Sequence, residues 1–289
     1  MRIVVTGANG LFGSGIVKVL RGQHDLVPLT RADADITNQN EIRATLHRVN
    51  PDVVIHTAAN PDPDDCQLHP EEARGVNVGG TKNVVAAAKE FGFALAFIST
   101  DAIFYGAKST PYVETDPPHP ISVYGETKLA AESEVRQLER HWIFRVSVLF
   151  GPGRVSGGSP GKLNFIEKGL RKIANGESYI VAADQIGSAT YTLDAVQAMQ
   201  EVIESRRYGL YHLSNQGSCS RLELAQRAAQ LAGLDPSMVK GLPLDQMGRP
   251  GPRPKYAVMQ MQAVREAGFT LPRPWQEALA EYVNQFWRA

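Results

Sequence analysis

Cysteine is scarce in this sequence of 289 residues, and it has neither an excess of charge nor a long apolar run. The 2 cysteines, Cys66 and Cys219, cannot form a disulfide framework, and no second cysteine or histidine stands at the spacing of zinc ligands. The 30 basic residues balance 30 acidic ones, which disfavours a protein held on nucleic acid by phosphate contacts. No apolar stretch approaches the roughly 18 residues of a membrane span, and no signal peptide is visible. We therefore expect a cytoplasmic protein with no metal ligands and no membrane or nucleic-acid partner.

The composition is that of a globular protein, with 43% hydrophobic and 21% charged residues. The first half alternates short apolar runs with longer amphipathic segments. Strands are predicted over 3–5, 26–29, 53–55, 94–98 and 142–146, and helices over 11–21, 38–49, 71–91 and 124–139. Strands separated by helices of this length pair in parallel. The pattern predicts an α/β fold with a Rossmann-type, doubly wound parallel sheet.

The regular alternation of predicted strands and helices ends at about residue 150. Helices are predicted over 165–174, 193–205, 221–232 and 274–286, and short strands over 179–181 and 210–213. The glycine-rich stretches 151–153 and 157–161 predict a flexible loop, and 243–254 is predicted to be irregular. We expect a Rossmann-type domain over residues 1–150 and a smaller, mostly helical domain over residues 151–289. Strands and helices can interleave between the two domains.

A glycine-rich turn lies between the first predicted strand and the first predicted helix. It runs from Gly7 to Gly13 with the spacing Gly-x-x-Gly-x-x-Gly. The first glycine allows a tight turn, the second lets the backbone approach a pyrophosphate, and the third lets the helix pack closely on the strand. The start of the helix then offers N–H groups and partial positive charge to that anion. The turn predicts a dinucleotide site formed by Gly7, Asn9, Gly10, Leu11, Phe12 and Gly13.

The residues after the second predicted strand favour one nicotinamide cofactor over the other. An acidic residue there would accept a hydrogen bond from the 2′-hydroxyl of NAD. This chain has Thr30 followed by Arg31, and a guanidinium suits the 2′-phosphate of NADP. Asp33 and Asp35 lie close by and leave NAD(H) open. The sequence therefore predicts NADP(H), with NAD(H) as the alternative.

Tyr124 and Lys128 stand at i and i+4 of a predicted helix and so share one of its faces. An ammonium beside a phenol favours the phenolate and lowers the pKa of the phenol. Tyr124 is predicted to give a proton to a carbonyl oxygen as hydride arrives at its carbon, and Lys128 to hold the nicotinamide ribose. Ser99 and Thr100 follow the fourth predicted strand, at the end where open α/β sheets bind ligands. The Thr100 hydroxyl is predicted to bind the same carbonyl oxygen, and Ser99 to lie against the cofactor.

These motifs resemble those of the extended short-chain dehydrogenases/reductases and, within that group, of the dTDP-4-dehydrorhamnose reductase family. The resemblance spans nearly the whole chain and rests further on Asp35-Ile36-Thr37, Asp184-Gln185-Ile186-Gly187 and the segment from Arg249 to Tyr256. It implies a nicotinamide cofactor across the sheet, a C-terminal domain that closes over a nucleotide sugar, and a 4-hydroxy deoxysugar as product. It implies that Thr100, Tyr124 and Lys128 are catalytic, that Asp35 and Ile36 lie near the adenine, and that Ala58 and Ala59 lie beside the cofactor.

Two departures from the family pattern fall where the sugar is expected. The family's Thr-Asp-Tyr-Val-Phe reads Thr100-Asp101-Ala102-Ile103-Phe104 here, and its Arg-x-Ser-Trp reads Arg145-Val146-Ser147-Val148. Both departures remove aromatic contact area expected near the sugar. The identity of the sugar therefore stays undecided, whereas the residues expected to support hydride transfer are unchanged. Arg249, Arg253 and Lys255 can meet a diphosphate, because guanidinium groups match phosphate oxygens. The predicted substrate contacts are Asp101, Ala102, Val148, Gln185 and Arg253.

The favoured interpretation is an NADPH-preferring reductase of a 4-keto sugar nucleotide, as in dTDP-rhamnose biosynthesis. The alternatives are a non-catalytic NADP-binding subunit resembling the methionine adenosyltransferase regulatory subunit, and a sugar-nucleotide epimerase or dehydratase. Arg31 disfavours the epimerase or dehydratase, because such enzymes commonly carry an acidic residue for tightly held NAD. The sequence does not decide the oligomeric state, and a homodimer is one possibility. His56 and His212 are predicted to be structural.

Overall fold

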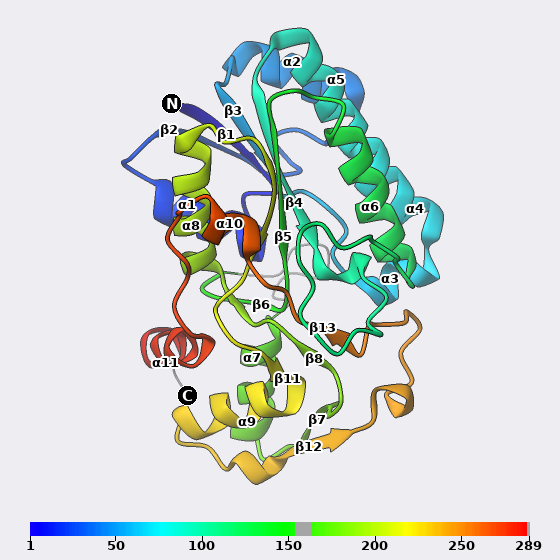
Figure 1. Cartoon of the computed structure of the whole chain (residues 1–289), viewed down its shortest axis with the longest axis vertical. Coiled ribbons are helices and arrows are strands. Elements are labelled where there is room, and N and C mark those ends of the chain that lie inside the picture. The colour runs from blue at the N-terminus through cyan, green and yellow to red at the C-terminus, as the bar shows by residue number, and fades with distance from the viewer. Residues whose placement is uncertain (154–162, 288–289) are drawn as a thin grey trace.

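A six-stranded parallel sheet forms the centre of the computed structural model, which describes residues 1–153 and 163–287 (Figure 1). The strand order is β10-β5-β4-β3-β1-β2. These strands are β1 (Arg2–Thr6), β2 (Asp25–Leu29), β3 (Val53–His56), β4 (Ala94–Thr100), β5 (His141–Val146) and β10 (Gly209–Leu213). The order reverses at β1, because the chain runs outward to β2 and then returns to pair β3 on the other side of β1. Open α/β sheets bind their ligands at such a switch point.

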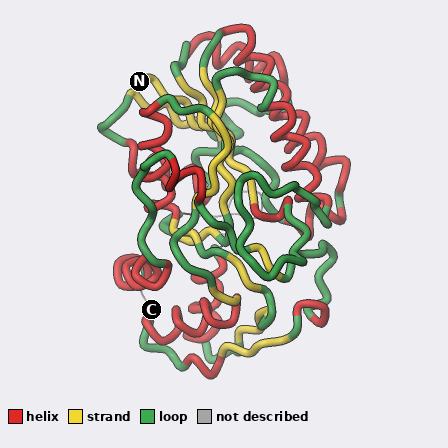
Figure 2. The backbone as a smooth tube through the Cα atoms, in the orientation of Figure 1, coloured by secondary structure: helices red, strands yellow, loops and turns green. Residues whose placement is uncertain are grey.

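Helices cover both faces of this sheet, and Figure 2 shows the strands between two groups of helices. One face is covered by α2 (Gln39–Val49), α5 (Thr81–Phe91) and α6 (Val123–Val135). The other face is covered by α1 (Leu11–Leu20), α8 (Thr192–Ser205) and α10 (Gln262–Glu266). Each face has its own core of buried apolar side chains. The doubly wound α/β fold predicted from the sequence is confirmed.

The local sequence explains where several of these elements begin and end. The run Ile3–Val5 of β1 is buried on both faces of the sheet and is therefore continuously apolar. Helix α2 begins after Asn38, whose side chain accepts a hydrogen bond from the amide of Glu41 at 3.2 Å. Pro28 lies in β2, an edge strand, where the missing N–H is tolerated.

The single helix predicted over 71–91 is interrupted. The chain forms α4 (Pro70–Arg74), a π-helical turn over Gly75–Gly80, and then α5. The wider turn accommodates the buried amide of Asn77, which accepts from the amide of Asn60 at 2.7 Å and donates to the hydroxyl of Thr127 at 3.0 Å. These partners satisfy a polar side chain that would otherwise be buried at a cost. The next predicted helix, 124–139, also ends early, because α6 stops at Val135.

The C-terminal part lies below this sheet in Figure 1 and has a core of its own. Its helices are α7 (Phe165–Ala174), α9 (Arg221–Leu231) and α11 (Trp275–Phe286). Its short strands are β6 (Leu149–Phe150), β7 (Tyr179–Ala182), β8 (Ile186–Gly187), β9 (Thr190–Tyr191), β11 (Cys219–Ser220), β12 (Val239–Leu242) and β13 (Tyr256–Ala257). The strand predicted over 210–213 is β10, which joins the edge of the main sheet beside β5. The loop predicted over 157–161 lies outside the described residues.

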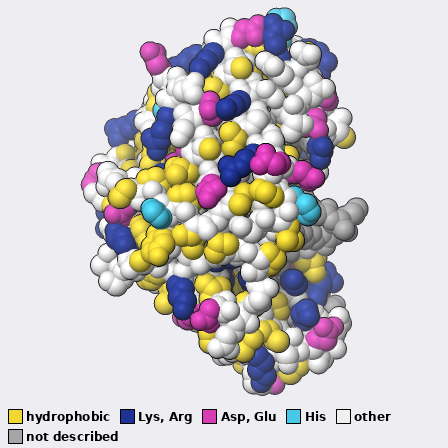
Figure 3. Space-filling view, turned by 90° about the vertical axis from the view of Figure 1, so that its right-hand side faces the viewer, with side chains coloured by type: hydrophobic (Ala, Val, Ile, Leu, Met, Phe, Trp, Pro, Cys, Tyr) yellow, Lys and Arg dark blue, Asp and Glu magenta, His cyan; other side chains and the backbone are white. Residues whose placement is uncertain are grey.

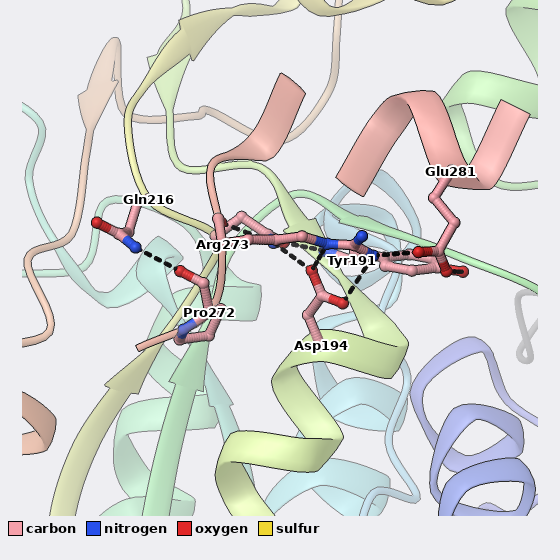
Figure 4. A network of polar contacts seen from close by, with 7 residues as sticks. Tyr191, Asp194, Gln216, Pro272, Arg273 and Glu281 are labelled. Atoms are coloured by element: carbon pink, nitrogen blue, oxygen red, sulfur yellow. Dashed lines mark hydrogen bonds and ion pairs between the residues drawn. The ribbon is translucent and has the colours of Figure 1, made fainter. Parts of the chain in front are cut away.

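A polar network joins α8 to the C-terminal helix α11 (Figure 4). Arg273 donates to both carboxylate oxygens of Asp194, at 3.0 and 3.1 Å, and its Nη2 lies 2.7 Å from Oε2 of Glu281. Nearby, the side chain of Gln216 donates to the carbonyl of Pro272 at 2.8 Å. Because α8 shares a core with α1, the network fixes α11 relative to the helix that starts at the glycine turn.

The surface carries charges of both signs. Figure 3 shows acidic and basic side chains interspersed over one face, in keeping with the balance of 30 basic and 30 acidic residues. Within residues 1–153 and 163–287, no helix is long and apolar enough to cross a membrane. The same ranges contain no group of three His, Cys, Asp or Glu side chains placed to hold a metal ion.

Candidate active site

A cavity of about 410 Å³ opens at the carboxyl ends of the central strands. The glycine turn and the segment after β3 form one wall, the ends of β4 and β5 with the start of α6 form a second, and the C-terminal part forms a third. Most of the predicted site residues line it, namely Gly10, Leu11, Phe12, Gly13, Ala59, Ser99, Thr100, Asp101, Ala102, Tyr124, Lys128, Val148, Gln185 and Arg253. The others lie outside its lining, namely Gly7, Asn9, Arg31, Asp35, Ile36 and Ala58.

Backbone geometry explains the glycines of the turn. Gly7 has a φ of +69°, and a β-carbon on it would come within 2.8 Å of the backbone of Ala58. A β-carbon on Gly13 would collide with the carbonyl oxygen of Gly7, so α1 packs against the turn only where no side chain intervenes. Gly10 precedes the first residue of α1 and supplies no side-chain cap. The first N–H groups of α1 are therefore available to an anion.

The residues predicted to bind the adenosine end form a cluster after β2. The Nε of Arg31 donates to Oδ2 of Asp35 at 3.0 Å, and the Arg31 side chain is 81% exposed. Hydrogen bonds from the amide and hydroxyl of Thr37, with a smaller contribution from Arg31, hold the pKa of Asp35 below its usual range. Ile36 packs against Gly80, where a β-carbon would meet it. Arg31 keeps solvent access for an anion, whereas the carboxylate of Asp35 is already occupied.

The tyrosine, lysine and threonine predicted to act together all lie at the cavity. Tyr124 and Lys128 project from α6, and Thr100 ends β4. Helix α6 begins after Ser122, whose hydroxyl caps its first turn. Lys128 is 4% exposed, and its Nζ donates to the carbonyl of Ile98 at 2.6 Å. The amine therefore fastens α6 to β4, directly beside the end of that strand.

The prediction that the pKa of Tyr124 lies below its ordinary value is wrong. Burial raises the pKa of Tyr124 above its ordinary value, a hydrogen bond with Thr100 opposes this in part, and the charge of Asp101 adds to it. Burial lowers the pKa of Lys128 to about 7, against the attraction of Glu132. The lysine amine is bound to the backbone of β4 rather than to the phenol. Tyr124 consequently holds its proton at neutral pH, as a proton donor must.

Asp101 lies beside Thr100 in the lining of the cavity. The Thr100 hydroxyl donates to its Oδ1 at 3.1 Å, and the Ser147 hydroxyl donates to its Oδ2. Burial raises the pKa of Asp101 above its usual range.

Ala102 and Val148, which stand where the family carries aromatic residues, also line the cavity. Val148 has a φ of +26°, which a β-branched residue adopts only where its surroundings impose it.

Three arginines, Arg221, Arg249 and Arg253, line the cavity from the C-terminal part. Arg253 forms an ion pair with Asp64 of α3 (Pro63–Leu68). Burial lowers the pKa of Arg221, and its Nε lies 3.5 Å from Oε1 of Gln185. Grouped guanidiniums suit a ligand with several phosphate oxygens. The wall they form therefore favours an anionic part of a ligand.

Arg221 has no local sequence signal for this role. It is the first residue of α9, far along the chain from Arg249, and only its place directly after the cap residue Ser220 distinguishes it. Lys255, predicted to join the arginine cluster, instead pairs with Asp184 at 3.0 Å and lies outside the cavity lining. The cationic wall thus contains Arg249 and Arg253, as predicted, with Arg221 in place of Lys255.

The two histidines predicted to be structural are buried among neighbours. Nδ1 of His56 lies 2.7 Å from the hydroxyl of Thr6, and its Nε2 lies 3.2 Å from the hydroxyl of Thr81. Nδ1 of His212 lies 3.1 Å from the carbonyl of Gln260. Burial lowers the pKa of both histidines to about 3. Both are neutral at pH 7 and lie outside the cavity lining, so they serve the fold.

Known proteins are similar to this chain in sequence and in architecture. The family model described as RmlD substrate binding domain matches residues 1–288. The dTDP-4-dehydrorhamnose reductase of Mycolicibacterium smegmatis is 34% identical over 98% of this chain and 85% of that protein. The spore coat polysaccharide biosynthesis protein SpsK of Bacillus subtilis is 32% identical over 98% of this chain and 97% of that protein.

A solved structure of a dTDP-4-dehydrorhamnose reductase from Bacillus anthracis, in complex with NADP, superposes on this chain with a TM-score of 0.92. The two sequences are 32% identical, and the match covers 98% of this chain and 99% of that chain. The shared fold therefore extends over the sheet, the cavity and the C-terminal part.

Proposed function

The chain belongs to the family described as RmlD substrate binding domain, and on this basis we propose that it reduces the 4-keto group of a sugar nucleotide with NADPH. It is an NAD(P)-dependent oxidoreductase of the extended short-chain dehydrogenase/reductase type, and its relatives are named dTDP-4-dehydrorhamnose reductase. One observation carries the proposal. Tyr124, Lys128 and Thr100 line the same cavity as the glycine turn that would receive the cofactor's diphosphate.

The proposed cofactor is NADP(H), with NAD(H) as a weaker ligand. Its diphosphate would rest on the N–H groups at the start of α1. The turn fits such a group, because β-carbons on Gly7 and Gly13 would fill or distort the cradle. The exposed guanidinium of Arg31 would bind the 2′-phosphate, and Lys128 the nicotinamide ribose. When bound, the cofactor supplies the hydride that reduces the keto carbon.

Tyr124 is proposed to donate the proton that the developing alkoxide needs. Its phenol, half-buried at the cavity, keeps that proton at neutral pH, which suits the reductive direction. The Thr100 hydroxyl lies beside the phenol and would hydrogen-bond the same substrate oxygen, which orients it. The charge of Lys128 on the same helix would stabilise the tyrosinate left after proton transfer. The three side chains thus bind one oxygen, protonate it and compensate the resulting charge.

The substrate is proposed to lie between the catalytic residues and the C-terminal part. Arg221, Arg249 and Arg253 would bind its diphosphate, because they line the cavity from the C-terminal part and their guanidinium groups match phosphate oxygens. Asp101, Ala102, Val148 and Gln185 would surround the sugar and its neighbouring phosphate. Residues 1–150 would then supply most of the cofactor site and residues 151–289 most of the substrate site. From the second range, α8 and β10 pack on or join the main sheet of the first.

The proposal is tested by incubating the purified protein with NADPH and dTDP-4-keto-6-deoxy sugars. Oxidation of NADPH in step with loss of the keto sugar is expected. NADPH binding without turnover of any such sugar would contradict the proposal and favour a non-catalytic binding subunit. Conversion of a sugar nucleotide without net NADPH consumption would instead indicate an epimerase or dehydratase, in which the cofactor recycles.

A further inference from the structure

A buried ionic cluster that the proposed mechanism does not use lies beside the catalytic lysine. Glu132 is 0% exposed and Arg145 is 2% exposed. Arg145 donates to both carboxylate oxygens of Glu132, at 3.0 Å from Nε and 2.9 Å from Nη2. The hydroxyl of Ser99 donates to the same carboxylate at 2.6 Å. Glu132 is therefore held by three charge-assisted hydrogen bonds, which is what a carboxylate needs to remain ionised in a core.

The cluster joins α6 and β4, which carry the proposed catalytic side chains, to β5. Glu132 lies on α6, one helical turn beyond Lys128 and two beyond Tyr124, so these three residues share a face of the helix. Ser99 lies on β4 directly before Thr100, and Arg145 lies opposite Ser99 on β5. A carboxylate bound at both strands consequently sets the position of α6 over the ends of β4 and β5.

Glu132 also supplies negative charge beside a lysine amine that is largely cut off from water. Burial lowers the pKa of Lys128 to about 7, and the charge of Glu132 opposes that effect. The other titratable groups facing Lys128 are His56 from β3, Cys66 from α3 and Tyr124 on its own helix. His56 is neutral, and burial keeps the Cys66 thiol and the Tyr124 phenol protonated. At neutral pH, of these described groups facing Lys128, Glu132 is the one that carries a negative charge.

We infer that Glu132 is a positioning residue of the active site, which fixes α6 on the strand ends and keeps the amine of Lys128 in its charged form. The inference rests on the proposed function, in which a charged lysine stabilises the tyrosinate. It makes Glu132 necessary for the pH range of activity although its side chain does not line the cavity. A purely structural ion pair would have no such effect on the lysine.

The titration of Lys128 tests this inference without any turnover. Protein labelled with ¹³C at lysine Cε is titrated by NMR, and the Lys128 signal is assigned from its absence in Lys128→Met. In Glu132→Gln the titration midpoint should fall by about one pH unit, because an opposite charge on the next helical turn is lost. The double variant Glu132→Gln with Arg145→Met removes both buried charges, so it covers the case in which the single variant does not fold. It should show a fall in the same direction, reduced by the simultaneous loss of the Arg145 positive charge.

Arg145→Lys is the matched control, because it weakens the pair while the charge of Glu132 remains. It should unfold at lower urea concentration yet leave the Lys128 midpoint within about 0.3 pH unit. The sign of the change separates the roles: loosening of the core admits water and raises the midpoint, whereas loss of the Glu132 charge lowers it. An unchanged or raised midpoint in the double variant would overturn the inference. If the midpoint falls but the protein reduces no sugar nucleotide, the inference about Glu132 stands and only the proposed reaction is contradicted.

Discussion

Replacing Tyr124 with phenylalanine removes the proposed proton donor and little else. A positioned general acid contributes roughly 10²–10⁴-fold in rate, so kcat should fall by that factor, or about 3–5 kcal/mol of transition-state stabilisation. The fold should survive, because the amine of Lys128 still ties α6 to the carbonyl of Ile98 at 2.6 Å. The hydrogen bond lost with Thr100 is worth about 0.5–1.5 kcal/mol of unfolding free energy.

The assay combines NADPH oxidation, a fluorescence titration with NADPH and urea unfolding. Affinity for NADPH should stay within a few-fold of wild type while turnover is lost. Tyr211→Phe is the matched control, because Tyr211 is buried, its hydroxyl donates to the carbonyl of Arg207 at 2.9 Å, and it lies on β10 outside the cavity lining. The control should keep wild-type kcat. A kcat of Tyr124→Phe within about tenfold of wild type would show that another group supplies the proton.

Three further predictions concern the cofactor site and the core. Gly13→Ala should abolish NADPH binding, because the new β-carbon would collide with the carbonyl of Gly7. Binding at wild-type affinity in a titration would contradict the proposal that the glycine turn holds the diphosphate. Arg31→Ala should reduce the preference for NADPH over NADH by about tenfold, measured as the ratio of kcat/KM values, and an unchanged ratio would remove Arg31 from the site. The free energy of unfolding should fall as pH drops from about 6.5 toward about 3, because His56 and His212 take up protons at about pH 6.5 only when unfolded. Urea unfolding at about pH 7.5 and about pH 5 measures this loss, and equal stability at both would contradict the two depressed values.

Features that depend on neighbours in the sequence were predictable. The apolar run Ile3–Val5, the cap at Asn38 and the spacing of the glycine turn each determine their own local structure. Tyr124 and Lys128 were placed correctly on one helix at the cavity, because an i, i+4 spacing decides which face they share.

Features that depend on distant contacts were not predictable in the same way. The predicted direction of the Tyr124 pKa was wrong, because burial raises it and the amine of Lys128 donates to a backbone carbonyl of β4 instead of the phenol. Arg221 reaches the cavity only through the packing of α9, and no pattern around it indicates a ligand. The π-helical turn at Asn77 likewise follows from partners on other elements. Residue type and spacing do not encode burial, and burial decides these outcomes.

The most direct test of the reductase assignment follows the hydride itself. The protein is incubated with dTDP-4-keto-6-deoxy sugar and NADPH that carries deuterium at C4 of the nicotinamide, each epimer in turn, and the product is examined by NMR. With one of the two epimers, the proposed mechanism predicts deuterium at C4 of the product sugar, one atom for each NADPH oxidised. A product without deuterium at C4 from either epimer, or sugar conversion with no NADPH oxidised, would contradict it.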